Sequence, residues 1–223
     1  MPLRAVKPQH ETRTRILDAA EELFMQHGFE GTSMRLLTGK AGVNLAAVNY
    51  HFGSKDALVE AVFRRRLDPI NAARIAELDK LEADGQVPTP DAIIRAFITP
   101  GLRLMEDTKG GGRNFTRLLG RTYTEPNKIV RQLIGQMYAP TMQRYKAALE
   151  RALPQMPREE LVWRMHFMFG TLAYTLAATD TVQLIAGCKP EDRYDARLLE
   201  DRLTAFLAAG LHAPLNSSIK KAA

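Results

Sequence analysis

The sequence predicts an all-α protein with a small N-terminal head of three helices and a larger C-terminal helical bundle. Three observations support this prediction. Apolar residues recur at the helical period of about 3.6 residues in almost every patterned stretch. Residues that cap and end helices are crowded into the first part of the chain, and the helical stretches lengthen after residue 55. We therefore expect one domain at residues 1–55 and a second at residues 56–223.

The composition excludes several classes of protein. The 223 residues are 45% hydrophobic and 25% charged, as in an ordinary folded protein, and the formal net charge of +6 permits binding to nucleic acid or acidic metabolites without establishing either. The single cysteine, Cys188, excludes an intramolecular disulfide and a zinc site made of several thiolates. The N-terminal segment lacks the apolar stretch of a signal peptide, and the apolar run at 165–178 is too short to span a bilayer. We expect a cytoplasmic protein.

The head begins with an apolar stripe at residues 12–27, which predicts an amphipathic helix. Gly28 follows it and can adopt the left-handed backbone conformation in which many helices end. Thr32 or Ser33 can cap a second, short helix that reaches about Ala41.

A third short helix is predicted at Leu45–His51. Gly42 breaks the helix before it, and Asn44 can cap the new one. Ser54 can then cap a longer helix that starts at Lys55 and leads out of the head.

Long helical patterns fill the rest of the chain. We expect Pro69 to kink or divide the helix that starts at Lys55, and Pro140 to kink a later one. Loops are expected at 84–90 and, because of its glycines, at 109–112. The remaining helices are expected at residues 91–105, 113–122, 127–153, 158–186 and 195–212.

Residues 33–51 have the layout of a helix-turn-helix, in which two short helices are joined by a tight turn. With Val48 facing the first helix, the small and polar residues of the 45–51 helix face outward. Asn49 can bond a base edge, the methyl groups of Leu45 or Ala46 can meet a thymine methyl, and polar groups at the helix end suit phosphates. The candidate DNA contacts are Asn44, Leu45, Ala46, Ala47, Asn49, Tyr50, His51 and Lys55. Capping alone would also explain Asn44, and His51 could be an ordinary surface histidine.

The run GFEGTSMRLLTGKAGVNLAAVNYHFGSKDALVEAVF, residues 28–63, resembles the DNA-binding head of TetR-family transcriptional repressors. The matching motifs are Gly28-Phe29, Thr32-Ser33, Ala41-Gly42-Val43, Tyr50-His51-Phe52, Ser54-Lys55 and Leu58. The resemblance covers residues 12–63 and implies a homodimeric repressor that reads a palindromic operator in double-stranded DNA with its 45–51 helix. It also implies phosphate contacts from Ser33, Tyr50, His51 and Lys55. Many members carry Gly or Lys-Gly where this chain has Ala46-Ala47, so the resemblance implies no base preference.

Two groups of basic residues flank these motifs. Arg4, Lys7, Arg13 and Arg15 fit either an arm that adds salt-sensitive affinity for DNA or a solvated tail. The triplet at residues 64–66 (Arg-Arg-Arg) is predicted to be a solvated helix face.

No arrangement of residues suggests catalysis. The sequence has no glycine-rich phosphate loop, no paired-histidine metal motif and no Ser, His and Asp set with a recognisable elbow. We therefore expect neither an enzyme nor a cofactor or metal site. Two alternatives remain: an all-helical enzyme with a structural head, and a DNA-binding protein that has no effector.

Two helices near the C-terminus predict a dimer interface. Residues 161–178 are apolar nearly all round, and the 195–212 helix has a broad apolar face, so each needs cover on more than one side. A symmetric four-helix interface would supply it, and so would the core of a monomer. The candidate interface residues are Leu176, Leu198, Leu199, Leu203, Phe206 and Leu207.

A ligand cavity is expected between the bundle helices, lined by apolar side chains with a few polar anchors. The candidates are Phe97, Leu104, Arg113, Phe115, Arg117, Leu118, Arg121, Met137, Tyr138, Trp163, His166, Phe167 and Gly170. For any one of the apolar members, the pattern favours plain core packing over contact with a ligand.

Arg113, Arg117 and Arg121 recur every four residues, which stacks their side chains along one helix face. Such a row could hold a phosphorylated head group or form a solvated stripe. The segments WRMHFMFGTLAYTL and FTRLLGRTY are similar to TetR-family members that control fatty-acid metabolism. That resemblance implies a fatty acid or acyl-CoA as the small-molecule effector that relieves repression, with the arginines serving the CoA phosphates.

Overall fold

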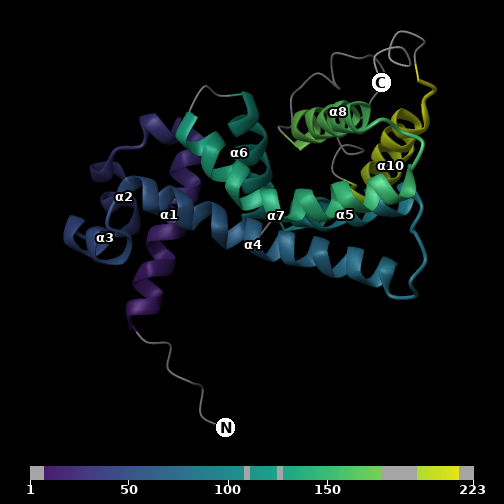
Figure 1. The fold of residues 1–223 in the computed structure, drawn as a ribbon. Coiled ribbons are helices and arrows are strands. Elements are labelled where there is room, and N and C mark those ends of the chain that lie inside the picture. Colours follow the sequence, from purple (N-terminus) through teal and green to yellow (C-terminus); the bar gives the residue numbers. More distant parts are fainter. Residues whose placement is uncertain (1–7, 108–110, 125–127, 177–194, 216–223) are drawn as a thin grey trace.

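The computed structural model describes residues 8–107, 111–124, 128–176 and 195–215, and these are helices joined by short turns, with no strand. The helices are α1 (Pro8–Gly31), α2 (Met34–Ala41), α3 (Leu45–Phe52), α4 (Lys55–Glu82), α5 (Pro90–Glu106), α6 (Gly112–Thr124), α7 (Lys128–Ala152), α8 (Arg158–Leu176) and α10 (Ala196–His212). The head, α1 to α3, lies at one end of the molecule, α8 and α10 lie at the other, and α4 runs between them (Figure 1). We call α4 to α10 the body. The predicted all-α fold is confirmed.

The predicted caps of the head are confirmed. Ser33 Oγ accepts a hydrogen bond from Leu36 N at 3.1 Å, and Asn44 Oδ1 accepts one from Ala47 N at 2.8 Å. Ser54 Oγ does the same for Ala57 N at the start of α4, at 3.1 Å. These bonds satisfy backbone N–H groups that have no partner within the first turn of a helix. The start of each short helix is therefore determined locally.

Two predicted breaks differ from the structure. Gly28, with φ 71°, kinks α1, and the helix resumes to Gly31 instead of ending there. Pro69 does not divide α4, which continues to Glu82, whereas a kink at Pro69 or at Pro140 stays a prediction. Each proline removes one backbone hydrogen bond from its helix and crowds the preceding turn.

The buried apolar residues form two clusters. The proximal core joins the head to α4, α6 and α7, and the distal core joins α5, α8 and α10 to the ends of α4 and α7. A series of rings crosses the proximal core from α1 to α6: Phe24–Phe29, Phe29–Phe63 and Phe63–Phe115, with centroids 5.2, 5.8 and 5.6 Å apart. The head thus shares its core with the body.

The arginine triplet of α4 is not a solvated face as predicted. Arg64 is exposed and pairs with Glu60 one turn away, at 2.7 Å. Arg65 and Arg66 instead turn toward α1, where both bind the buried carboxylate of Glu21. Sequence spacing could not show this, because Glu21 lies more than forty residues earlier in the chain.

Candidate DNA-binding surface and ligand pocket

Helix α3 presents a polar and small-residue surface to solvent at the head end of the molecule (Figure 1). Val48 is buried against the head core, as predicted. Leu45, Ala46 and Asn49 are exposed, and Tyr50 is 75% exposed, with its ring 5.2 Å from that of His51. A helix with such a face can enter a groove of DNA closely and offer hydrogen bonds and methyl groups to base edges.

The remaining candidate DNA contacts lie around this face. Ala47 and His51 are half-buried. Ser33 and Asn44 use their side-chain oxygens as caps, which leaves the Ser33 hydroxyl hydrogen and the Asn44 amide N–H groups as donors. Lys55 stands half-buried in the first turn of α4.

The predicted basic arm is described only in part. The guanidinium of Arg13 lies over the ring of Phe52, 5.3 Å from its centroid, so this residue belongs to the folded head. Arg15 is exposed on α1. Arg4 and Lys7 lie outside the described residues.

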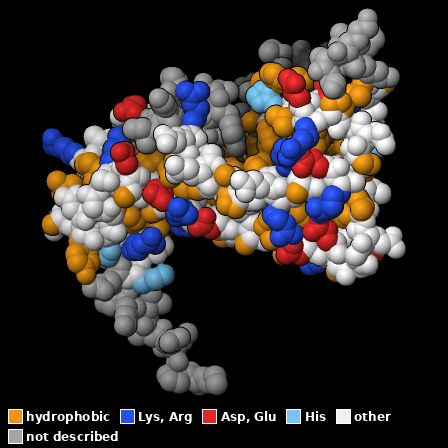
Figure 2. Space-filling view, in the orientation of Figure 1, with side chains coloured by type: hydrophobic (Ala, Val, Ile, Leu, Met, Phe, Trp, Pro, Cys, Tyr) orange, Lys and Arg blue, Asp and Glu red, His pale blue; other side chains and the backbone are white. Residues whose placement is uncertain are grey.

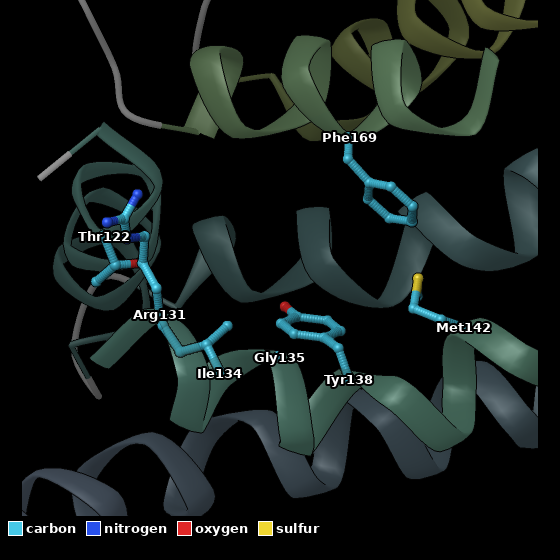
Figure 3. Close-up of a pocket in the computed structure, with 7 residues that line it drawn as sticks. All are labelled: Thr122, Arg131, Ile134, Gly135, Tyr138, Met142 and Phe169. Carbon is cyan, nitrogen blue, oxygen red and sulfur yellow. The ribbon is translucent and has the colours of Figure 1, made fainter. Parts of the chain in front are cut away.

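An apolar cavity of about 240 Å³ opens between α6, α7 and α8 (Figure 3). Figure 2 shows hydrophobic side chains gathered in a hollow below α8, at the body end of the molecule. The lining residues are Thr122, Arg131, Ile134, Gly135, Tyr138, Met142 and Phe169. Tyr138 and Ile134 reach into the cavity from α7 and Phe169 from α8, while Arg131 lies at the α6 side (Figure 3). The described lining residues are mostly apolar and include one cation and no acid, a composition that suits the tail of an amphiphile.

Of the predicted ligand residues whose side chains the structure describes, Tyr138 alone lines this cavity. Phe115, Leu118 and Met137 are buried in the proximal core with Leu104 packed against it, and Phe97 is buried in the distal core. Trp163, His166, Phe167 and Gly170 are exposed on α8. The side chains of Arg113, Arg117 and Arg121 lie outside the described residues, although their backbone forms part of α6. The other lining residues of α7 could have been found from the sequence, because residues 131, 134, 138 and 142 are spaced so that they lie on one helix face.

A buried guanidinium stands behind the aromatic wall of the cavity. Arg74 of α4 is 3% exposed and takes part in no ion pair with a described residue. It donates hydrogen bonds from Nε to Phe97 O at 2.8 Å and from Nη1 to Asn71 Oδ1 at 3.2 Å. Its charge lies 4.0 Å from the ring centroid of Phe97 and 5.4 Å from that of Tyr138. Asn71 Nδ2 in turn donates to Met137 O at 3.1 Å. This polar layer separates the two apolar cores along α4.

The outer face of α8 is apolar and aromatic. Trp163, Phe167 and Tyr174 are each about half exposed or more, and the rings of Trp163 and Phe167 lie 6.0 Å apart. Phe206 of α10 is 67% exposed. Exposed apolar side chains gathered on one face are typical of interaction surfaces.

The predicted dimer residues divide between this face and the interior. Leu176, Leu203 and Leu207 are buried in the distal core of their own chain, and Leu198 and Leu199 are half-buried. Of the six, Phe206 is the exposed member. Burial in the same chain uses the inner face of α10, so a second molecule would meet the other side of these helices.

Two family models match the chain. The model for bacterial regulatory proteins of the tetR family matches residues 16–62, and the model for the tetracyclin repressor-like C-terminal domain matches residues 95–210. Curated relatives include the HTH-type transcriptional regulators UidR of Escherichia coli, 41% identical over 51 residues, and SrpR of Pseudomonas putida, 36% identical over 70. These alignments cover 23% and 31% of this chain, and 26% and 33% of the respective relatives. The chain therefore matches only about a third or less of the length of these relatives.

Solved structures share the whole fold at low identity. Salmonella enterica GusR matches with a TM-score of 0.62 and 18% identity, over 94% of this chain and 98% of that one. The regulator FadR of Bacillus subtilis, in complex with stearoyl-CoA, matches with a TM-score of 0.64 and 17% identity, over 89% and 99%. At such identities the likeness extends to the fold alone. Among the described helices, none is both long and apolar enough to cross a membrane.

Proposed function

The chain belongs to the TetR family of DNA-binding transcriptional regulators, and we propose that it is a homodimeric repressor whose palindromic operator is released when an amphipathic effector fills the cavity between α6, α7 and α8. The observation that carries this proposal is the pairing of a capped, outward-facing α3 in the head with an apolar cavity in the body. In this division of labour, residues 1–55 contact DNA and residues 56–223 bind the effector and the second copy.

The DNA contacts divide into two roles. Asn49, with its neighbours Leu45, Ala46 and Ala47, faces base edges in the major groove, where each base pair presents its own pattern of donors and acceptors. Ser33, Tyr50, His51 and Lys55 surround that face and bind phosphates, with Asn44 at the helix start. Two such heads on a symmetric dimer enter successive major grooves of a palindrome.

The second copy covers the outer face of α8 together with Phe206. Aromatic side chains supply most of the energy of typical interfaces, and Trp163, Phe167 and Tyr174 offer three on one helix. A twofold axis passing by α8 would pair this face with itself.

The effector is an anionic amphiphile, with a fatty acid or acyl-CoA as the best candidate. Its tail fits the lining formed by Ile134, Met142 and Phe169, while Arg131 at the cavity and Arg74 behind its wall favour a negative charge. The cavity of about 240 Å³ is below the usual range of about 300–1,000 Å³ for small-molecule sites. A long chain would therefore select an expanded arrangement of α6, α7 and α8, which shifts the population away from the DNA-binding form.

The first test separates the two kinds of DNA contact. Tyr50→Ala should weaken binding to all duplexes alike by about tenfold and leave the salt dependence unchanged, because it removes a neutral phosphate contact. Asn49→Ala should instead relax the preference between bases at one position. Binding-site selection from random duplexes, followed by fluorescence anisotropy at two salt concentrations, measures both. Identical effects of the two variants would contradict the assigned roles.

The second test concerns the effector. Sodium dodecanoate should raise the melting temperature by several degrees and release the selected operator, because it binds the folded state. The same chain with other head groups, 1-dodecanol and dodecyltrimethylammonium, provides the controls, and Arg131→Gln should remove the preference for the anion. Failure of dodecanoate, of a longer fatty acid and of its CoA ester to change either measurement would contradict an acyl effector.

A further inference from the structure

Five charged side chains meet where the head joins the body. Glu21 of α1 is buried, and its two carboxylate oxygens bind both Arg65 and Arg66 of α4. Arg66 approaches with Nη2 at 2.8 Å from Oε1 and Nε at 3.1 Å from Oε2, a two-pronged contact. Arg65 also binds Asp18 at 2.6 Å, and Arg66 Nη1 lies 3.8 Å from Asp107 after α5. We call these residues the Glu21 cluster.

Among the described residues of the head, Glu21 is the one whose carboxylate binds both arginines, which makes it the central member. Its side chain is 6% exposed, and those of Arg65 and Arg66 are 24% and 17% exposed, so water screens these charges weakly. Without the carboxylate, Arg65 would keep Asp18 and Arg66 would keep the more distant Asp107, but the contact that ties both arginines of α4 to one point of α1 would be lost. Glu21 therefore adds a polar contact to the apolar packing of α1 on α4.

The beginning of α6 rests on the same cluster. Gly111, immediately before α6, has a φ of +83°, and a methyl group there would lie 3.1 Å from Arg66 Nη2 and 3.2 Å from Glu21 Oε1. Phe115 N donates to Gly111 O at 3.0 Å, which ties this residue to the first turn of α6. The opposite end of α6 carries Thr122, which lines the cavity. A single helix, about 17 Å long between these points at 1.5 Å per residue, thus touches both the cavity and the Glu21 cluster.

We propose that Glu21 is a positioning residue: its contacts with Arg65 and Arg66 set the orientation of the DNA-binding head on the body, and Gly111 leaves these contacts room at the start of α6. The inference rests on the proposed function for its operator, but the role of Glu21 in holding the head does not need one.

The experiment compares two pairs of variants. Glu21→Gln removes the buried charge, and Glu22→Gln is its matched control, because Glu22 is the next residue of α1 but pairs at 2.7 Å with Lys40 inside the head. Gly111→Ala pushes a methyl group into the cluster. Gly85→Ala is its control, since Gly85 has a similar φ of +75° with no atom within 4 Å of the added methyl.

The readout is the distance between the head and the body of one protomer. Pulsed electron paramagnetic resonance measures this distance between two spin labels. The labels are attached at the exposed positions Arg35→Cys of α2 and Gln143→Cys of α7, in a Cys188→Ser background. Labelled protein is diluted with unlabelled protein so that each dimer carries one labelled protomer. Affinity for the selected operator is measured on the same variants without labels.

Glu21→Gln and Gly111→Ala should displace or broaden the distance distribution and lower operator affinity by about tenfold, within the usual range of coupling between sites. Glu22→Gln and Gly85→Ala should match the wild type. Distributions for Glu21→Gln and Gly111→Ala that overlay the wild type would overturn the proposal, whatever their effect on stability. Should Glu21→Gln fail to fold, Arg66→Lys keeps the charge, loses the two-pronged contact and is judged by the same distance. Absence of operator binding by the wild type would refute the proposed function, while the distance measurement would still decide the role of Glu21.

Discussion

The two cores of the molecule differ in what completes them. The proximal core contains the Phe24–Phe29–Phe63–Phe115 series, spans head and body, and is closed at its edge by the Glu21 cluster. The distal core is built largely from Leu and Ile of α5 and α10, and the helix that covers it, α8, leaves an aromatic outer face open. One core is completed within the chain, and the other is covered by a helix whose outer apolar surface stays exposed.

The cavity lies between these two cores. Asn71 and Arg74 form the polar layer behind it, and Tyr138 packs against the proximal core while Phe169 packs against the distal one. A ligand at this boundary can change how one core sits on the other without disrupting either.

The largest expected effect comes from the shared proximal core. Phe63 is fully buried between two rings, so Phe63→Ala should lower the free energy of unfolding by about 3–5 kcal/mol and loosen head and body together. Urea unfolding followed by circular dichroism measures the loss, and hydrogen exchange shows where it falls. Leu211→Ala, at a buried site of the distal core, is the comparison and should spare the amides of α1 to α3. Equal loss of protection in the head for both variants would remove the distinction between the cores.

The next effect concerns the open face of α8. Replacing Trp163 and Phe167 with Ser should weaken the dimer by about 100-fold or more, because each exposed aromatic ring is expected to be a main contact with the second copy. Monomer stability should change little, since both side chains already face solvent. Sedimentation velocity over a range of concentrations measures the dissociation constant, and Leu45→Ser, an equally exposed apolar position in the head, is the control. An unchanged dimer would place the interface elsewhere.

The smallest effect tests the boundary itself and depends on pH. Tyr145 donates its hydroxyl to Arg74 O at 2.7 Å, and burial raises the pKa of this phenol above its ordinary value of 10.0. The folded state therefore favours the neutral phenol, so its contribution is fully present below pH 10 and is lost above it, by about 1.4 kcal/mol per pH unit. Tyr145→Phe should cost about 1 kcal/mol at pH 7 and flatten the alkaline loss of stability. Urea midpoints at pH 7 and between pH 10 and 11 measure both, and an alkaline slope identical to that of the wild type would contradict the role of the buried phenol.

Much of the head could be predicted because its signals are local. The caps at Ser33, Asn44 and Ser54 act within one helical turn, and the inward position of Val48 follows from the helical period. The effect of Pro69 was less predictable, because its local cost to the helix competes with the tertiary packing of the rest of α4, which continues to Glu82.

The roles of the apolar residues in the body could not be predicted in the same way. The sequence predicts Trp163 and Phe167 in the ligand site and Leu203 and Leu207 at the dimer interface, whereas the structure exposes the first pair and buries the second in the distal core. Helices that are apolar nearly all round carry no periodic signal for direction, so packing against α5 decided which side of α10 turned inward.

The sequence by itself determined the all-α fold, the helix-turn-helix and the family, because caps, glycine turns and helical periodicity act over a few residues. The tertiary structure alone decided the position of the cavity, the open face of α8 and the Glu21 cluster. Each of these depends on side chains brought together from distant parts of the chain, as when Glu21 meets Arg65 and Arg66. A charged residue in a sequence shows no partner, and burial next to a distant opposite charge is what gives it a specific role.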